Sequence, residues 1–171
     1  MPLPRKYELD GGLGISRILD LLQGSDEPEA DRRFFLKAQI AFWLLVATGG
    51  HAKNFSIRLL PGGRFRMTPL NDVMSAQQNA DAGEISRNRM KLTMVDGDNR
   101  HYVVDTILPR QFFETAGRSG VAALVQGIFD ELAAHVPGPL DSVPNTLPAG
   151  FPIKLSESIA NGVRRRLGLI K

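Results

Sequence analysis

Cysteine is absent from the 171 residues of this sequence. Its absence excludes a disulfide scaffold, a thiolate zinc site, an iron–sulfur cluster and a cysteine nucleophile. Long hydrophobic runs are missing as well, since the longest apolar stretch, Ala41 to Ala47, is far shorter than the ~20 residues needed to cross a bilayer. The start of the chain, Met1 to Lys6, contains no apolar signal core. We therefore expect a cytoplasmic protein without a membrane partner.

Charge of one sign is in small excess, because 21 Lys and Arg residues against 18 Asp and Glu residues give a formal net charge of +3. The long-range field of such a chain is too weak to indicate nucleic-acid binding by itself. Basic residues do gather near the C-terminus, where Arg164, Arg165 and Arg166 are consecutive. A solvated helix face explains this run better than a nucleic-acid contact does.

Common catalytic motifs are also missing. The chain has no Gly-x-x-x-x-Gly-Lys phosphate loop, no Gly-x-Ser-x-Gly elbow and no His-Glu-x-x-His zinc motif. Its histidines, His51, His101 and His135, lack metal-ligand spacing. Nucleotide binding by a phosphate loop, ester hydrolysis by a serine elbow and catalysis by a His-Glu-x-x-His zinc site are thereby excluded.

The residues that are present suffice for one helical core, with 43% hydrophobic and 23% charged residues. Helical spacing of apolar residues and the stop signals that follow them predict several helices. The predicted helices span residues 14–23, 31–47, 109–116, 119–136 and 153–167. Asp31 and Ser119 are the expected N-caps of two of them, and the glycines at 49 and 50 are expected to end the second. Five prolines between 137 and 152 predict an extended connector over 139–152.

Two hairpins are predicted. Residues 55–60 and 64–68 alternate apolar and polar side chains around a Pro-Gly-Gly loop, so Leu60 should face Arg64. A second hairpin is expected from residues 91–95 and 100–104, and the polar stretch 77–88 should be a loop. The predicted fold class is mainly α (α+β), a single domain over residues 1–171 with one or two small β-hairpins.

The first hairpin brings two polar strings together. Continued pairing sets Asn54 opposite Leu70, and Asp72 lies two residues beyond, so an amide oxygen and a carboxylate can converge. Together with phosphate oxygens they form a hard-ligand set suited to Mg²⁺. His51 and Lys53 lie in the preceding loop, where polar groups could meet a phosphate. On spacing alone, ordinary turn and cap roles for these residues remain the better explanation, since Asn and Asp are common in turns.

A resemblance to a known family favours the metal and phosphate site over ordinary turn and cap roles. The sequence resembles the C-terminal half of a HipA-family serine/threonine kinase, the toxin of bacterial HipA/HipB toxin–antitoxin pairs. The matching strings are residues 6–15, 31–34, 51–56 (His-Ala-Lys-Asn-Phe-Ser), 69–73 (Pro-Leu-Asn-Asp-Val), 91–92 and 107–110. The strings at residues 51–56 and 69–73 together form a specific signature. The resemblance implies a kinase-like helical C-lobe.

The resemblance also implies roles for individual residues. In this family a loop of the form Asp-x-x-x-x-Asn orients the substrate hydroxyl and holds a metal, and a later aspartate holds the metal too. Asn54 and Asp72 match the two metal-holding positions. By the same match, nucleotide-binding positions are His51, Ala52, Lys53, Asn54, Asn71 and Asp72, and the implied cofactors are ATP and Mg²⁺.

Two departures from the family pattern bear on activity. Counting back five residues from Asn54 gives the position of the catalytic aspartate, and that residue is Gly49. Loss of a general base typically lowers the rate by about 10²- to 10⁴-fold. The chain also begins where a HipA-like C-lobe begins, so we expect no N-lobe and no effective kinase activity from these residues alone.

Several functions stay open under this resemblance. The chain could be a split kinase that becomes active when an N-lobe docks. It could instead be a binding module for a HipB-like antitoxin, for a separately encoded N-lobe, or for operator DNA. In the region that matches the DNA-contacting part of the family, Arg118 is the basic residue.

Overall fold

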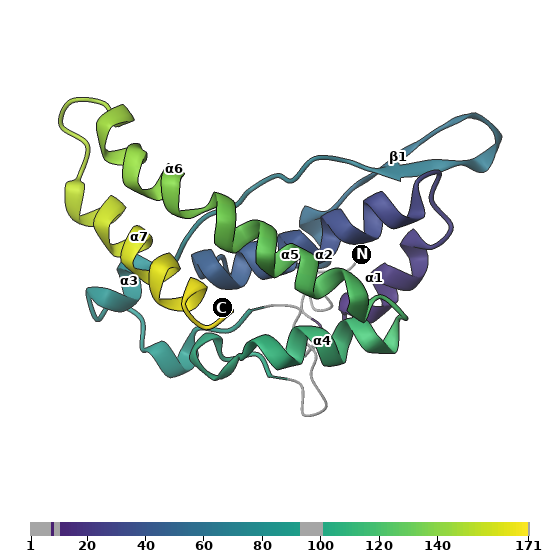
Figure 1. Cartoon of the computed structure of the whole chain (residues 1–171), viewed down its shortest axis with the longest axis horizontal. Coiled ribbons are helices and arrows are strands. Elements are labelled where there is room, and N and C mark those ends of the chain that lie inside the picture. The colour runs from purple at the N-terminus through teal and green to yellow at the C-terminus, as the bar shows by residue number, and fades with distance from the viewer. Residues whose placement is uncertain (1–7, 9–10, 93–100, 171) are drawn as a thin grey trace.

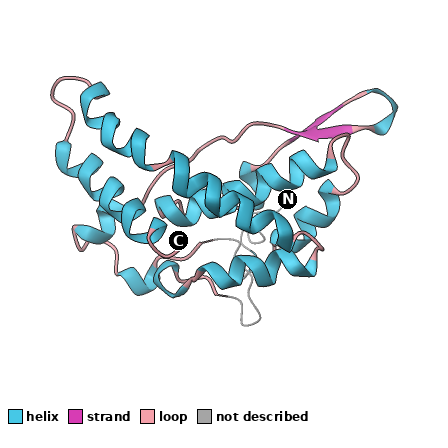
Figure 2. Cartoon of the chain, viewed as in Figure 1, coloured by secondary structure: helices cyan, strands magenta, loops and turns pink. Residues whose placement is uncertain are grey.

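The structure is a computed structural model that describes residue 8 and residues 11–92 and 101–170. Helices form most of it, and one two-stranded antiparallel sheet projects from the helical body (Figures 1 and 2). The predicted class, mainly helical with a small hairpin, is confirmed. The elements are α1 (Ile15–Leu22), α2 (Pro28–Leu45), β1 (Ile57–Leu59), β2 (Phe65–Met67), α3 (Gln77–Asp81), α4 (Pro109–Arg118), α5 (Ala122–His135), α6 (Pro137–Ser142) and α7 (Ile153–Leu167).

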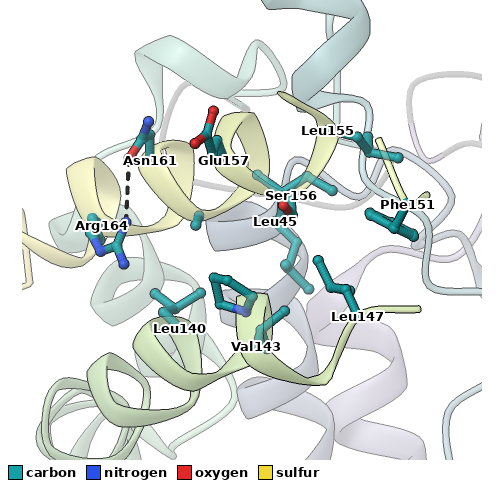
Figure 3. A pocket seen from close by; sticks show the side chains of 13 residues that line it. Leu45, Leu140, Val143, Leu147, Phe151, Leu155, Ser156, Glu157, Asn161 and Arg164 are labelled. Atoms are coloured by element: carbon teal, nitrogen blue, oxygen red, sulfur yellow. Dashed lines mark hydrogen bonds between the residues drawn. The ribbon is translucent and has the colours of Figure 1, made fainter. Parts of the chain in front are cut away.

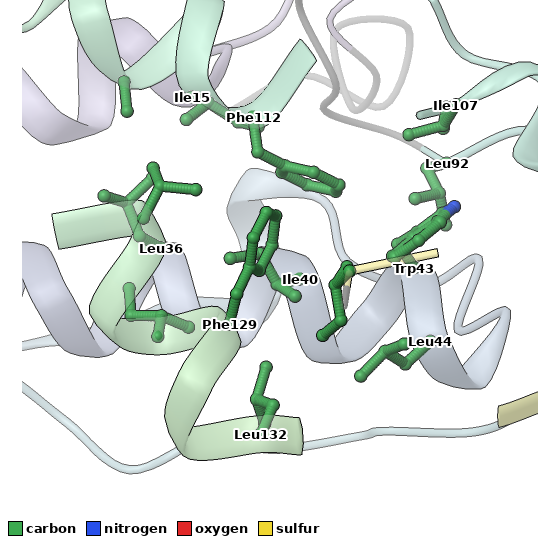
Figure 4. Close-up of a cluster of buried hydrophobic side chains, with 14 of the residues drawn as sticks. Ile15, Leu36, Ile40, Trp43, Leu44, Leu92, Ile107, Phe112, Phe129 and Leu132 are labelled. Carbon is green, nitrogen blue, oxygen red and sulfur yellow. The ribbon is translucent and has the colours of Figure 1, made fainter. Parts of the chain in front are cut away.

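Helix α2 is the central element of the core. Its second half is apolar nearly all round, and the helix packs against α1, α5 and α7, so many of its side chains are buried. Trp43, which is fully buried, lies 5.6 Å from Phe112 of α4 between ring centroids, and Phe112 lies 6.3 Å from Phe129 of α5 (Figure 4). Such aromatic contacts add to the burial of apolar area and hold α2 in a fixed position.

Both predicted ends of α2 are wrong. The helix begins at Pro28, because proline fits the first helical position, and Asp31 is a buried residue inside it instead of its cap. The Asp31 carboxylate accepts a hydrogen bond from the Met67 N–H of β2 at 3.1 Å. At the other end the helix stops at Leu45, since Val46 adopts a left-handed conformation with φ 53° before either glycine is reached.

The first hairpin has the predicted register. Ile57 pairs with Met67, and the Leu60 N–H donates to the Arg64 carbonyl at 2.8 Å. The ladder ends where the Thr68 N–H donates to the Ser56 carbonyl at 3.0 Å. The sheet is therefore continuous up to two residues from Asn54.

The second predicted hairpin is described only at its open end. Lys91 and Val103 form an antiparallel bridge, and the Leu92 N–H donates to the Tyr102 carbonyl at 2.8 Å. The predicted turn, residues 96–99, lies outside the described residues, as do residues 6, 7, 9 and 10 of the first matching string. The stretch 77–88 was expected to be a loop, and this is wrong, because its first five residues form α3.

The predicted extended connector over residues 139–152 is wrong. Helix α5 ends near the predicted stop, but Pro137 then occupies the first position of α6, and a 3₁₀ turn, Val143–Thr146, follows. Proline is tolerated in a first helical turn, so the stretch is mostly helical instead of extended. Ser119 is likewise not an N-cap, since it follows α4 as its C-cap and α5 begins at Ala122.

The last helix, α7, has the predicted bounds of Ile153–Leu167 and packs on α2 and α3. Among the described residues, no helix combines the length and apolar character needed to span a membrane.

Candidate functional site

The loop that follows α2 carries the first half of the candidate site. After Val46, the Ala47 N–H donates to the Phe42 carbonyl at 2.8 Å, which closes the helix end and turns the chain. Gly50 then packs under the buried Phe42 ring, so close that a Cβ atom on Gly50 would lie 2.3 Å from Phe42 Cδ2. The loop is thereby fixed to the rigid core one residue after Gly49.

Asn54 is locked in place by this loop. It ends a 3₁₀ turn, Ala52–Asn54, and its N–H donates to the His51 carbonyl at 2.9 Å. Its side-chain Nδ2 donates to the Gly49 carbonyl at 2.7 Å and to Asp72 Oδ2 at 3.3 Å. Because both amide hydrogens are directed to these acceptors, the amide oxygen Oδ1 stays available to a ligand.

Asp72 brings the second half. It follows β2 in an exposed position and adopts φ 56°, a left-handed conformation that costs energy for any residue except glycine, although Asp and Asn tolerate it best. Such strain persists only where the surrounding structure holds it. Asn54 is not paired with Leu70 in the sheet, because Asn54 lies in the 3₁₀ turn, but the predicted convergence of Asn54 and Asp72 is confirmed by the contact between their side chains.

The segment after Asp72 is anchored to the end of α2. The Ser75 hydroxyl donates to the Leu45 carbonyl, and the Ala76 N–H donates to the Val46 carbonyl at 3.0 Å. Carbonyl groups in the last turn of a helix have no partner within the helix, so they are ready acceptors for an incoming segment. We call these two hydrogen bonds the α2 anchor. Both halves of the site thus depend on the same helix end.

The remaining predicted nucleotide-binding residues differ in exposure. Lys53 and Asn71 are exposed, and each directly precedes a residue of the Asn54 and Asp72 pair in the sequence. His51 is buried, and its backbone N–H donates to the Gly49 carbonyl at 2.7 Å. Ala52 is half-buried and lines an apolar pocket of about 160 Å³ between α1 and the hairpin. The exposed pair can reach a ligand directly, whereas His51 and Ala52 shape the loop.

Gly49 has room for a side chain. An added Cβ would lie 3.6 Å from both Asn54 Nδ2 and the Asp72 carbonyl oxygen, which is ordinary van der Waals contact. Its φ is outside the left-handed region. Neither space nor backbone strain therefore requires glycine at this position.

The described residues include no group of three or more His, Asp or Glu side chains placed to hold a metal ion. By themselves, Asn54 and Asp72 offer one amide oxygen and one carboxylate as ligands. A divalent cation here would need further oxygens from phosphate or water, as is usual for Mg²⁺ bound together with a nucleotide.

Two predicted basic features are placed elsewhere. Arg118 is exposed at the end of α4 and lines a polar pocket with Arg17 and Asp20. In the C-terminal run, Arg164 and Arg165 are exposed, and Arg164 pairs with Asp141 at 2.7 Å, as expected of a solvated face.

Arg166 is the exception, because the prediction of a solvated face is wrong for this residue. Its residue is only 3% exposed. It falls three positions after Val163 and seven after Ile159, so it lies on the apolar face of α7. That spacing is the signal that could have found it.

A larger hollow lies apart from the candidate site. A cavity of about 530 Å³ opens between α6 and α7, and the side chains of Leu140, Leu147 and Phe151 point into it (Figure 3). Its polar side chains, among them Asn161 and Arg164, are on α7, and its floor includes Leu45.

Comparisons with known proteins agree with this architecture. Residues 1–139 match the family of HipA-like C-terminal domains. The structure is similar to a chain of the complex of the toxin–antitoxin proteins HipA and HipB with operator DNA from Shewanella oneidensis MR-1, with a TM-score of 0.81 and 19% sequence identity. The match covers 99% of this chain and 42% of that chain, so this chain spans less than half the length of the relative.

Proposed function

Because this chain belongs to the HipA-like C-terminal domain family, we propose that its Asn54 and Asp72 side chains hold Mg²⁺ on the phosphates of ATP, as part of a HipA-like protein serine/threonine kinase site. The observation that carries the proposal is the contact between Asn54 Nδ2 and Asp72 Oδ2 at 3.3 Å. It joins two strings 18 residues apart at the end of one hairpin.

The donor set fits a hard divalent cation. Asn54 Nδ2 is held by the Gly49 carbonyl at 2.7 Å, which leaves the amide oxygen for a metal, and Asp72 offers a carboxylate. When bound, Mg²⁺ would neutralise phosphate charge at this point. Lys53 and Asn71, both exposed, are the side chains of this chain that we assign to phosphate contacts.

We further propose that these residues do not transfer phosphate on their own. Gly49 has no group to accept a proton or orient a hydroxyl, and a missing general base typically lowers the rate by about 10²- to 10⁴-fold. Enclosure of the nucleotide is assigned to an N-lobe outside these residues, either separately encoded or joined to this chain. Binding without turnover is therefore the expected behaviour of this half.

A metal titration tests the first part of the proposal. In ¹⁵N-labelled protein, Mn²⁺ should broaden the amide signals of Asn54 and Asp72 first, because a paramagnetic ion acts on its nearest nuclei. The variant Asp72→Asn should abolish this local broadening, since Asn tolerates the same left-handed backbone but lacks the charge. Asp130→Asn, on the exposed face of α5, is the matched control. Broadening that ignores Asp72→Asn would refute the metal assignment.

Restoring the base tests the second part. Gly49→Asp should fold normally, given the 3.6 Å clearance around an added Cβ. With a HipA-like N-lobe supplied in trans and Mg²⁺ and ATP present, it should raise phosphotransfer above the unaltered chain. Gly138→Asp, where an added Cβ meets nothing within 4 Å, adds the same charge away from the site and should not. Equal activity of the two variants in a confirmed complex would show that more than the base is missing.

A second candidate function is that of a binding module for a HipB-like antitoxin or operator DNA. It is favoured by the composition of the Shewanella complex, which contains HipA, HipB and operator DNA. For DNA the support within this chain is weaker, because Arg118 shares its pocket with Asp20. Loss of operator binding by an antitoxin complex on Arg118→Ala would support the DNA contact, whereas an unchanged affinity and salt dependence would remove it.

A further inference from the structure

Arg166 connects α7 to both segments that enter the candidate site. Its Nε donates to the Leu44 carbonyl in the last turn of α2 at 3.0 Å, and its Nη2 donates to Gln77 Oε1 at the start of α3 at 2.6 Å. Leu44 lies five residues before Gly49, and Gln77 lies five residues after Asp72. One guanidinium group thus spans the two chain segments from which the site is built.

Gln77 passes this connection further into α3. Its Nε2 donates to both carboxylate oxygens of Asp81 at 3.0 Å, and the Ser158 hydroxyl of α7 donates to the same carboxylate at 2.6 Å. Asp81 is therefore hydrogen-bonded from α3 and α7 and also pairs with Arg87; burial raises its pKa, but the Ser158 and Gln77 hydrogen bonds and the charges of Arg87 and Arg165 lower it overall. The polar chain from Leu44 to Asp81 fixes α3 against α7 and α2.

Burial of the Arg166 guanidinium group at this position costs free energy. Among the described residues its Nη1 has no hydrogen-bond partner, its two acceptors are the uncharged Leu44 carbonyl and Gln77 amide, and the carboxylates of Asp105 and Asp81 act on it only as neighbouring charges. Burial, followed by the neighbouring charge of Arg165, lowers the pKa of Arg166 to about 10. An apolar side chain of similar volume is often as stable as a buried ion or more so. Packing stability alone therefore does not explain a guanidinium at this place.

We propose that Arg166 is a positioning residue for the Asn54 and Asp72 pair, because it holds the helix end and the α3 start that together fix the α2 anchor. Without Arg166, the Leu44 carbonyl and Gln77 lose their common donor, and the segment from Asp72 to Ala76 keeps the α2 anchor and the Asn54 contact but not the support of a fixed α3 start. The strained backbone at Asp72 then relaxes more readily, which moves the carboxylate away from Asn54. This role rests on the proposed metal site, since a positioned pair matters only if it binds.

The test uses the whole 171-residue chain and the variant Arg166→Met, which keeps the long apolar stem but removes the donors. Val163→Ala is the matched control, because Val163 is buried one turn earlier on α7 and its truncation weakens packing without removing a hydrogen-bond donor. Two quantities are measured by NMR. One is hydrogen exchange of the Ala76 amide without metal, and the other is the affinity for Mn²⁺ at Asn54 and Asp72.

Arg166→Met should speed Ala76 exchange by about tenfold, the order expected for loss of a hydrogen bond to a charged group. It should also weaken Mn²⁺ binding by about tenfold, as removal of groups that orient ligands commonly does. Val163→Ala, compared under conditions of equal global stability, should change neither. If Arg166→Met has no larger effect than Val163→Ala on either quantity, the proposal is overturned.

The outcomes also separate this inference from the proposed function. If the unaltered chain fails to bind Mn²⁺ at the pair, the metal assignment fails and the positioning role for that site falls with it, whereas the exchange result then reports only on the anchor. If Arg166→Met does not fold, Gln77→Met removes the acceptor on α3 and carries the same two measurements. Faster Ala76 exchange and weaker Mn²⁺ binding in Gln77→Met support the proposal, and unchanged values contradict it.

Discussion

Two adjacent glycines offer a direct test of how the site loop is fixed to the core. The change is Gly50→Ala compared with Gly49→Ala, which adds the same methyl group at neighbouring positions. At Gly50 the new Cβ would lie 2.3 Å from Phe42 Cδ2 and 2.7 Å from Phe42 Cε2. The Phe42 ring cannot move aside easily, because it is 3% exposed and packs on Phe55 with ring centroids 5.8 Å apart.

The two variants should change the free energy of unfolding differently. Forcing a methyl group into a packed core costs about 1–3 kcal/mol, so Gly50→Ala should lower the free energy of unfolding by that amount. Gly49→Ala meets only contacts at 3.6 Å at an ordinary φ. It should be neutral or stabilising by about 0.4–1 kcal/mol, because alanine restricts the unfolded chain. The two variants should therefore differ by about 1–4 kcal/mol.

Urea unfolding followed by circular dichroism measures this difference. With an m-value of about 2 kcal/mol/M, the midpoints of the two variants should be separated by about 0.5–2 M. Equal midpoints would refute the reasoning, since they would mean that the loop at Gly50 does not press on Phe42. The m-values should agree, because neither change alters the surface exposed on unfolding.

Three further predictions concern the elements around the site. Asp31→Ala should lower the free energy of unfolding by about 1–3 kcal/mol in a urea titration, because it leaves the half-buried Met67 N–H without its acceptor, while Asp20→Ala on the exposed face of α1 should change little. The hydrogen bond from Lys37 lowers the pKa of Glu131, with help from Arg33, so the stabilisation by Glu131 is present above its ordinary pKa of 4.5 and is lost as the pH falls through the lowered value. The stability difference between the unaltered chain and Glu131→Gln should accordingly shrink as the pH is lowered below 4.5, and a constant difference would contradict the assignment. Gly162→Ala would place a Cβ 2.4 Å from Gln77 Oε1, so it should displace Gln77 from Arg166 and speed Ala76 amide exchange, which an unchanged exchange rate would disprove.

Local patterns predicted those elements whose signals are local. Helix α7 was predicted at its observed bounds, since its apolar residues recur every four positions and proline precedes it. The hairpin register followed from the Pro-Gly-Gly loop and alternation. From that register came the convergence of Asn54 and Asp72, although a 3₁₀ turn and not the sheet makes the final approach.

The errors arose where distant contacts decide the local structure. Helix α2 ends at Val46 in a left-handed conformation, which a β-branched residue rarely adopts and which no sequence signal marks. Its free carbonyls find donors 30 residues or more away, in Ser75 and Arg166. Asp31 was read as a cap because its partner, Met67, lies 36 residues further along the chain. The predictions for Pro137 to Pro152 failed for a local reason, namely that proline begins helices as readily as it ends them.

The hydrogen bonds of the site explain how Gly49 can stand in a loop that is otherwise intact. Asn54 Nδ2 and the His51 N–H both donate to the backbone carbonyl of Gly49, at 2.7 Å each, and neither needs a side chain there. The segment that follows Asp72 is held by the α2 anchor through Ser75 and Ala76. The frame that holds the Asn54 and Asp72 side chains is thus independent of the side chain at 49. Under the proposed function, metal binding by Asn54 and Asp72 therefore does not depend on a general base at position 49, so the Gly49→Asp variant should leave Mn²⁺ binding at the pair unchanged.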